Sequence, residues 1–127
     1  MKINILDGGI IFELNKEYSD YGEYAVMHNP MLVKKLYQSY INIGSSYLTT
    51  SNYGFTPLKI DNWKEATIQS LNLIQEFRSS HVKVCGCIPP FFKSYSTEPV
   101  TEDFKLFYHQ LVSLMILYLN KILLSNT

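Results

Sequence analysis

The chain has 127 residues, of which 46% are hydrophobic and 17% are charged. These proportions support one folded domain or a part of one, and they exclude an intrinsically disordered chain. Eleven basic residues balance eleven acidic ones, so nucleic acid and anionic membranes are not expected as partners. The longest apolar run, residues 111–119, is too short for a membrane-spanning helix, which needs about 20 residues.

The first predicted strand is the apolar run at residues 3–6, which ends in the turn Asp7-Gly8-Gly9. A helix is predicted to begin at Asn29-Pro30, with Asn29 as its N-cap, and to end at Gly44. Residues 47–50 are β-rich and predict the second strand.

The second half of the chain repeats this alternation. Asp61 is placed to cap a second helix, whose apolar positions run through residues 63–77. Residues 82–85 predict the third strand. Thr101 is placed to cap a third helix with apolar positions over residues 104–118.

A last apolar run, residues 122–124, predicts a fourth strand and completes an order of β-α-β-α-β-α-β. The strands are apolar throughout, as in parallel sheets that are covered on both faces. Two α/β architectures fit this order: an open doubly wound sheet, or part of a (β/α)8 barrel. The first turn is not G-x-G-x-x-G, so the dinucleotide-binding form of the open sheet loses its main support.

The two cysteines, Cys85 and Cys87, are separated by one residue. A disulfide between residues so close in sequence would be strained, so we expect reduced thiols and a cytoplasmic location. The N-terminus has no basic segment or small-residue cleavage site, and no signal peptide is expected. The spacing of these cysteines does not match a metal site, which favours buried structural thiols.

Five short segments carry a resemblance to a known family. They are Ile5-Leu6-Asp7-Gly8-Gly9 with Glu13-Leu14; Asn29-Pro30 with Leu32-Val33 and Tyr40…Gly44; Leu48-Thr49-Thr50…Tyr53…Thr56-Pro57; residues 84–90; and Phe107-Tyr108-His109. In this order they resemble the motifs of the homocysteine S-methyltransferases. The resemblance implies a TIM-type (β/α)8 barrel, a fold that typically needs about 250 residues. Residues 1–127 would then be a truncated homocysteine-binding barrel domain, with about four parallel strands and three helices.

The resemblance also implies an activity, which is methyl transfer to the homocysteine thiol from S-methylmethionine, S-adenosylmethionine or a betaine. The family binds zinc through three cysteines in the later part of the barrel, and zinc holds homocysteine as the nucleophilic thiolate. None of these cysteines is expected among the 127 residues, so no zinc or other cofactor is expected in this chain. The predicted protein is therefore homocysteine S-methyltransferase-like, truncated and inactive alone, with no catalytic residues.

Two alternatives stay open. One is a non-catalytic half-barrel that binds a partner through its unpaired edge strands, either as a homodimer or with a missing C-terminal half. The other is a flavodoxin-like domain with a phosphate-containing ligand, which is supported by the Asp-Gly-Gly turn and the polar loop after the second strand.

The substrate-binding residues that the resemblance implies are Asp7, Gly8, Gly9, Thr50 and Asn126. Asp7 would bind the amino group of homocysteine, and backbone N–H groups at Gly8 and Gly9 its carboxylate. Thr50 would face the same pocket, and Asn126 takes the place of a family Glu that holds the amino group. The simpler interpretations are a tight turn at residues 7–9, a β-branched strand residue at Thr50 and a frayed terminus at Asn126.

Overall fold

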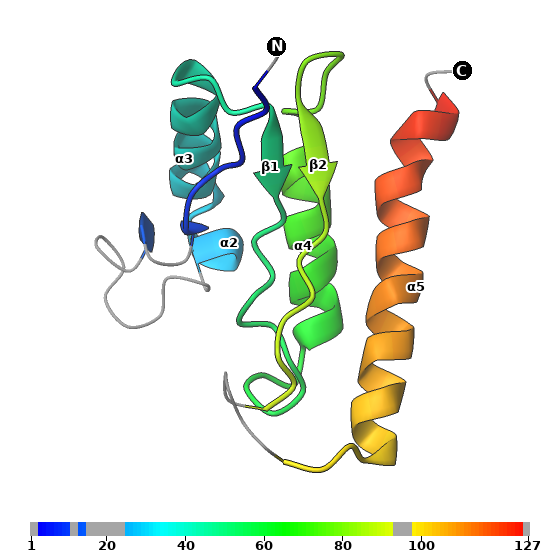
Figure 1. Ribbon diagram of the computed structural model, residues 1–127. Coiled ribbons are helices and arrows are strands. Elements are labelled where there is room, and N and C mark those ends of the chain that lie inside the picture. The colour runs from blue at the N-terminus through cyan, green and yellow to red at the C-terminus, as the bar shows by residue number, and fades with distance from the viewer. Residues whose placement is uncertain (1–2, 11–12, 15–24, 93–97, 126–127) are drawn as a thin grey trace.

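The computed structural model describes residues 3–10, 13–14, 25–92 and 98–125 (Figure 1). From α3 onward its helices and strands alternate, which is consistent with the α/β class. In chain order they are α2 (Ala25–His28), α3 (Pro30–Asn42), β1 (Tyr47–Thr49), α4 (Trp63–Gln75), β2 (Lys83–Cys85) and α5 (Glu102–Ser125).

Strands β1 and β2 form a parallel pair, with Tyr47 opposite Lys83 and Thr49 opposite Cys85. The N-terminal segment runs along the other side of β1, where Leu6 makes an isolated parallel bridge to Tyr47. The expected first strand is thus present as one bridge. Leu6 is 60% exposed, so little burial is available to stabilise a longer strand there.

The expected fourth strand is wrong, because residues 122–124 lie within α5. No glycine or proline interrupts α5, and leucine favours a helix strongly, so the helix continues through this apolar run. A short apolar run cannot be assigned to strand or helix by periodicity alone. The described residues therefore form two paired strands and one bridge, instead of the four strands expected for half of a barrel.

One of the three predicted helix caps is confirmed. The Phe104 N–H donates a hydrogen bond of 3.2 Å to Thr101 Oγ1 at the start of α5. Asn29 occupies the N-cap position of α3, but its side chain makes no capping hydrogen bond. Helix α4 has Asn62 at its N-cap instead of Asp61, so it begins one residue later than predicted.

Gly44 lies just after the C-terminal end of α3, close to where the sequence predicted that the helix ends. Its φ is +104°, a backbone conformation that side chains other than glycine rarely adopt. The next residue, Ser45, donates its N–H to the Tyr40 carbonyl at 2.9 Å, which turns the chain from α3 into β1.

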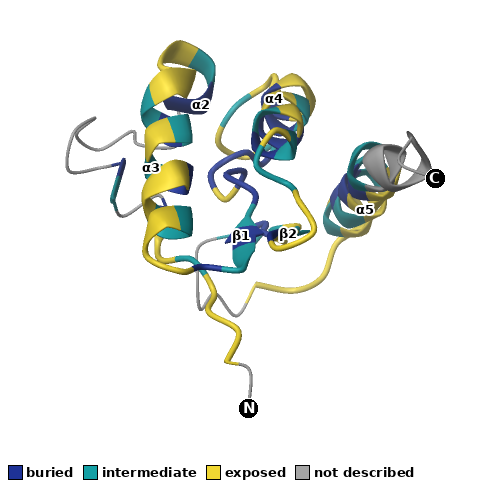
Figure 2. Cartoon of the chain, turned by 90° about the horizontal axis from the view of Figure 1, so that it is seen from above, coloured by how far each residue is buried: buried dark blue, intermediate teal, exposed yellow. Residues whose placement is uncertain are grey.

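The helices cover one side of the strands. Helix α4 lies behind β1 and β2, α3 lies on the β1 side of the strands, and α5 lies on the β2 side (Figure 1). Seen from above, the helices turn their buried sides inward (Figure 2). Fully buried core side chains come from β1 (Leu48), α4 (Leu71, Ile74) and α5 (Phe107, Leu111). Among the described residues, no helix is long and apolar enough to cross a membrane.

An aromatic contact joins α4 to α5. The Trp63 and Phe107 rings meet edge to face, with their centroids 4.8 Å apart. We predict that Phe107→Ala lowers the free energy of unfolding by about 3–5 kcal/mol, because it removes this contact and leaves a cavity. The matched control is Leu106→Ala on the exposed side of the same helix, which should change stability by less than about 0.5 kcal/mol. Urea unfolding measures both, and equal losses would contradict this packing.

Candidate functional site

A cavity opens at the carboxyl ends of the strands. Because parallel strands end at the same edge of a sheet, polar side chains that follow them in sequence meet there. The cavity has a volume of about 330 Å³. Its lining residues are Leu6, Asp7, Gly8, Gly9, Ile10, Thr49, Thr50, Ser51, Tyr53 and Cys87. Four of the five residues predicted for the site, Asp7, Gly8, Gly9 and Thr50, thus line one cavity.

Asp7 is held by both of its carboxylate oxygens. The Thr49 N–H donates to Oδ2 at 2.8 Å, and the Thr49 hydroxyl donates to Oδ1 at 2.9 Å. Burial raises the pKa of Asp7 above its ordinary value, and the two bonds from Thr49 work against that shift. Each oxygen keeps a further acceptor position. The result is an oriented, partly desolvated acceptor on the cavity wall, which is suited to a cationic or hydrogen-bond-donating group.

Gly8 packs against a tyrosine of α3. A Cβ at Gly8 would lie 2.6 Å from the Tyr40 hydroxyl oxygen, so any larger residue would require the Tyr40 ring to move. The pKa of Tyr40 is raised by burial and by the nearby acidic groups of Glu13 and Asp7, which keeps the phenol neutral. Close packing explains Gly8 by itself, and the carboxylate-binding role of the Gly8 and Gly9 N–H groups stays a prediction.

Thr50 lines the cavity, but its hydroxyl is already engaged. The hydroxyl donates to Asn52 Oδ1 at 2.6 Å and accepts the Cys87 N–H at 2.8 Å. Thr50 itself is buried. Its side chain therefore shapes the cavity wall, and its hydrogen bonds connect the loops that follow β1 and β2.

Sequence reasoning missed two supports of the site, Thr49 and Tyr37. The Tyr37 hydroxyl, which α3 brings to the end of β1, donates to the Thr49 carbonyl at 2.6 Å. It also shares a hydrogen bond of 2.5 Å with Ser51 Oγ. Burial raises the pKa of Tyr37, so the phenol stays a neutral donor. The sequence predicted the helix that carries Tyr37, but it carried no signal for the strand end that the hydroxyl would reach.

Asn126, the fifth predicted site residue, lies outside the described residues. Cys85 and Cys87 are free, and each is half-buried, where buried structural thiols were expected. Burial raises the pKa of the Cys87 thiol to about 11, so it is protonated at neutral pH. A protonated thiol is a poor metal ligand. Within the described ranges no three His, Cys, Asp or Glu side chains could hold a metal ion, so these residues do not fit a zinc site.

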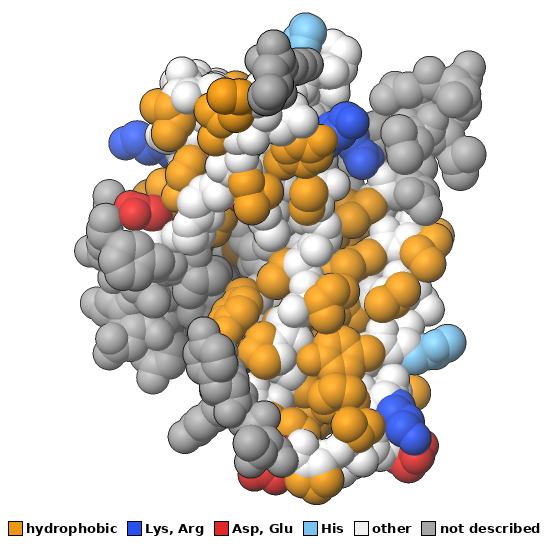
Figure 3. All heavy atoms as spheres, viewed as in Figure 1, with side chains coloured by type: hydrophobic (Ala, Val, Ile, Leu, Met, Phe, Trp, Pro, Cys, Tyr) orange, Lys and Arg blue, Asp and Glu red, His pale blue; other side chains and the backbone are white. Residues whose placement is uncertain are grey.

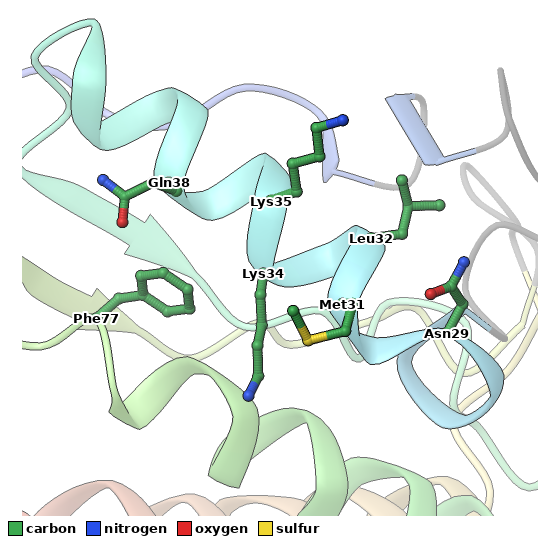
Figure 4. A pocket seen from close by; sticks show the side chains of 7 residues that line it. All are labelled: Asn29, Met31, Leu32, Lys34, Lys35, Gln38 and Phe77. Atoms are coloured by element: carbon green, nitrogen blue, oxygen red, sulfur yellow. The ribbon is translucent and has the colours of Figure 1, made fainter.

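A second, larger cavity of about 510 Å³ lies on the outer side of α3. Its lining residues are Asn29, Met31, Leu32, Lys34, Lys35, Gln38 and Phe77 (Figure 4). Lys34 extends toward α4, whereas Lys35 points away from it. The Lys34 ammonium is 2.8 Å from Glu76, an ion pair on the surface. We assign this groove no function.

The Asp7–Thr49 pair makes a prediction about stability. In Asp7→Asn the amide oxygen can accept the Thr49 N–H while the amide NH2 donates to the Thr49 hydroxyl, which reverses the second bond. The substitution also removes the partly buried charge, so stability at pH 7 should equal or exceed that of the wild type. Asp7→Ala leaves the Thr49 N–H without this partner and should lower the free energy of unfolding by about 1–3 kcal/mol. Urea unfolding of both variants measures the difference.

The raised pKa of Asp7 also predicts how the stability difference between the wild type and Asp7→Asn changes with pH. Because the pKa of folded Asp7 is raised above 3.8, the stability that Asp7 contributes is fully present below that value. It is lost as the pH rises through the folded pKa. Wild-type stability relative to Asp7→Asn should therefore fall as the pH rises from below 3.8 through the raised folded pKa of Asp7. A rise over this interval would contradict the assigned burial.

The comparison with protein families agrees with this site. The family model described as homocysteine S-methyltransferase matches residues 4–123, a range that includes the whole cavity. Neither the curated proteins nor the solved structures contain a match to the chain. Since the family match covers nearly all of the 127 residues, the chain belongs to the homocysteine S-methyltransferase family.

Proposed function

We propose that this chain binds homocysteine, or a closely similar α-amino acid, in the cavity at Asp7. The observation that carries this proposal is the Asp7 carboxylate, which Thr49 orients on the cavity wall through both oxygens. Membership of the family supplies the substrate class. The amino group of the ligand would bind Asp7, because a carboxylate attracts an ammonium more strongly where both are shielded from water.

The rest of the cavity suits the remainder of such a ligand. Leu6, Ile10 and Tyr53 line it beside the polar groups, and they provide apolar contacts for the two methylene groups of the side chain. The cavity volume of about 330 Å³ is sufficient for a small amino acid.

We also propose that the 127 residues do not transfer a methyl group alone, and that they act as a truncated part of the family's barrel. Methyl transfer to sulfur needs homocysteine as the thiolate, since the thiolate is the nucleophile. The described lining residues of the cavity include no Lys, Arg or His that would stabilise this thiolate, and the nearby Asp7 carboxylate would disfavour it. The described residues do not fit a zinc site, and no catalytic step is assigned to them.

Calorimetry with homocysteine tests the binding proposal. Asp7→Asn should weaken binding by about tenfold or more, because it removes the charge that faces the ammonium. The wild type should also prefer homocysteine over 4-mercaptobutanoate, which lacks the amino group, and Asp7→Asn should lose this preference. The matched control is Asp103→Asn, the same substitution at an exposed position of α5, which should bind like the wild type.

Binding by Asp7→Asn that equals the wild type would disprove the role of Asp7, and no wild-type binding would disprove the proposed function. The same protein, incubated with zinc, homocysteine and each of the three donor types, should form no methionine. Methionine formation above a protein-free control would disprove the proposed inactivity.

A second candidate function is self-association. Hydrophobic side chains spread over the front of the molecule, from the strands to α5 (Figure 3). Leu6, which makes the bridge to β1, and Ile88, which follows β2 in sequence, are 60% and 54% exposed. Extended exposed apolar surface is typical of protein–protein contact sites, which favours a second copy of the chain as a partner.

Sedimentation velocity tests self-association. The wild type should form dimers at micromolar concentration, and Ile88→Glu should shift it to monomer because the substitution places a charge in the contact. Met31→Glu is the matched control, since Met31 is similarly exposed but lies on α3, away from the strands. A wild type that stays monomeric, or two variants that behave alike, would argue against this candidate.

A further inference from the structure

Three hydrogen bonds form a closed ring between the ends of β1 and β2. The Thr50 hydroxyl donates to Asn52 Oδ1 at 2.6 Å, and Asn52 Nδ2 donates to the Cys87 carbonyl at 3.0 Å. The Cys87 N–H closes the ring by donating to the Thr50 hydroxyl oxygen at 2.8 Å. The ring continues the connection between the strands beyond their last paired residues, Thr49 and Cys85.

Asn52 holds this ring together without touching the cavity. Its side chain is 0% exposed and is not part of the cavity lining, whereas Thr50 and Cys87 both are. Its amide accepts a hydrogen bond at one end and donates one at the other, which a carboxylate cannot do. Loss of the amide would leave buried polar groups of both neighbours without a partner, a strongly unfavourable state.

We propose that Asn52 is a positioning residue of the amino-acid site, acting through Thr50 and Cys87. By closing the ring, Asn52 sets the position of the cavity wall that these two residues form. The ring also anchors the strand end that carries Thr49, the residue that orients Asp7. This inference rests on the proposed function, since it names a further residue on which amino-acid binding depends.

The test uses Asn52→Ala, which removes both hydrogen bonds, and the isosteric Asn52→Asp, which loses the donor to the Cys87 carbonyl. Each should weaken homocysteine binding about tenfold, the effect of one unsatisfied buried group. Both should keep the wild-type preference for homocysteine over 4-mercaptobutanoate, because Asp7 is intact. If Asn52→Ala does not fold, Asn52→Asp decides the result.

Thr56→Val is the matched control. Thr56 is buried in the same loop, and its hydroxyl has no hydrogen-bond partner among the described residues. The substitution removes a buried polar group close in sequence to Asn52 without breaking the ring. Its binding of homocysteine should stay within about twofold of the wild type.

Alkylation of Cys87, followed by mass spectrometry in a Cys85→Ser background, gives a readout that does not depend on binding. Opening the ring should expose the thiol and speed its reaction roughly tenfold, because each unit of pKa lost multiplies the thiolate fraction by ten. Affinity and labelling are compared under conditions where every variant is folded and labelling is slow compared with reclosing, and the labelling rate is corrected for the measured free energy of unfolding.

The outcomes separate the two proposals. Absence of homocysteine binding by the wild type would reject the proposed function, and unchanged Cys87 labelling in folded Asn52 variants would reject the ring as a positioning device. Wild-type binding that is lost in Asp7→Asn but retained within about twofold in both Asn52 variants would overturn the inference and leave the function standing.

Discussion

The attachment of the N-terminal segment to β1 combines a few backbone hydrogen bonds with two bonds to the carboxylate of Asp7. Backbone pairing there is sparse, with a single bridge from Leu6 to Tyr47 and few hydrogen bonds around it. The two bonds from Thr49 to Asp7 extend this attachment past the bridge and bring residues 7–9 over the ends of the strands. The same carboxylate is the proposed contact for the amino group of the ligand, so Asp7 contributes both to the fold and to the binding site.

Next to this pair, side-chain hydrogen bonds hold the ends of β1 and β2 where backbone pairing between the strands has stopped. Tyr37 supports the Thr49 carbonyl from α3, and Asn52 links Thr50 to Cys87 across the two strands. Such buried bonds are directional and are unfavourable to break, so they fix the positions of the side chains that line the cavity. They also explain why the Thr50 hydroxyl has a structural partner, although the residue borders the site.

Much of the fold followed from local patterns. Helices α3 and α4 and both paired strands lie where the periodicity predicted them, because their apolar positions face the core. The run at residues 122–124 was assigned wrongly, since a short apolar segment suits a strand and a helix equally. The cap at Thr101 was predictable from its residue type. The N-cap of α4 is Asn62 and not Asp61, because sequence signals locate the start of a helix only to within a residue or two.

The sequence by itself determined the family, the α/β class and the tight turn at Asp7-Gly8-Gly9, because these follow from residues close together in the chain. Only the tertiary structure showed that Thr49 orients Asp7, that Asn52 joins two loops and that burial keeps the Cys87 thiol protonated. Thr49 and Asp7 are 42 positions apart, and Asn52 and Cys87 are 35 apart. Partners at such separations are selected by strand register and helix packing, which no local pattern specifies.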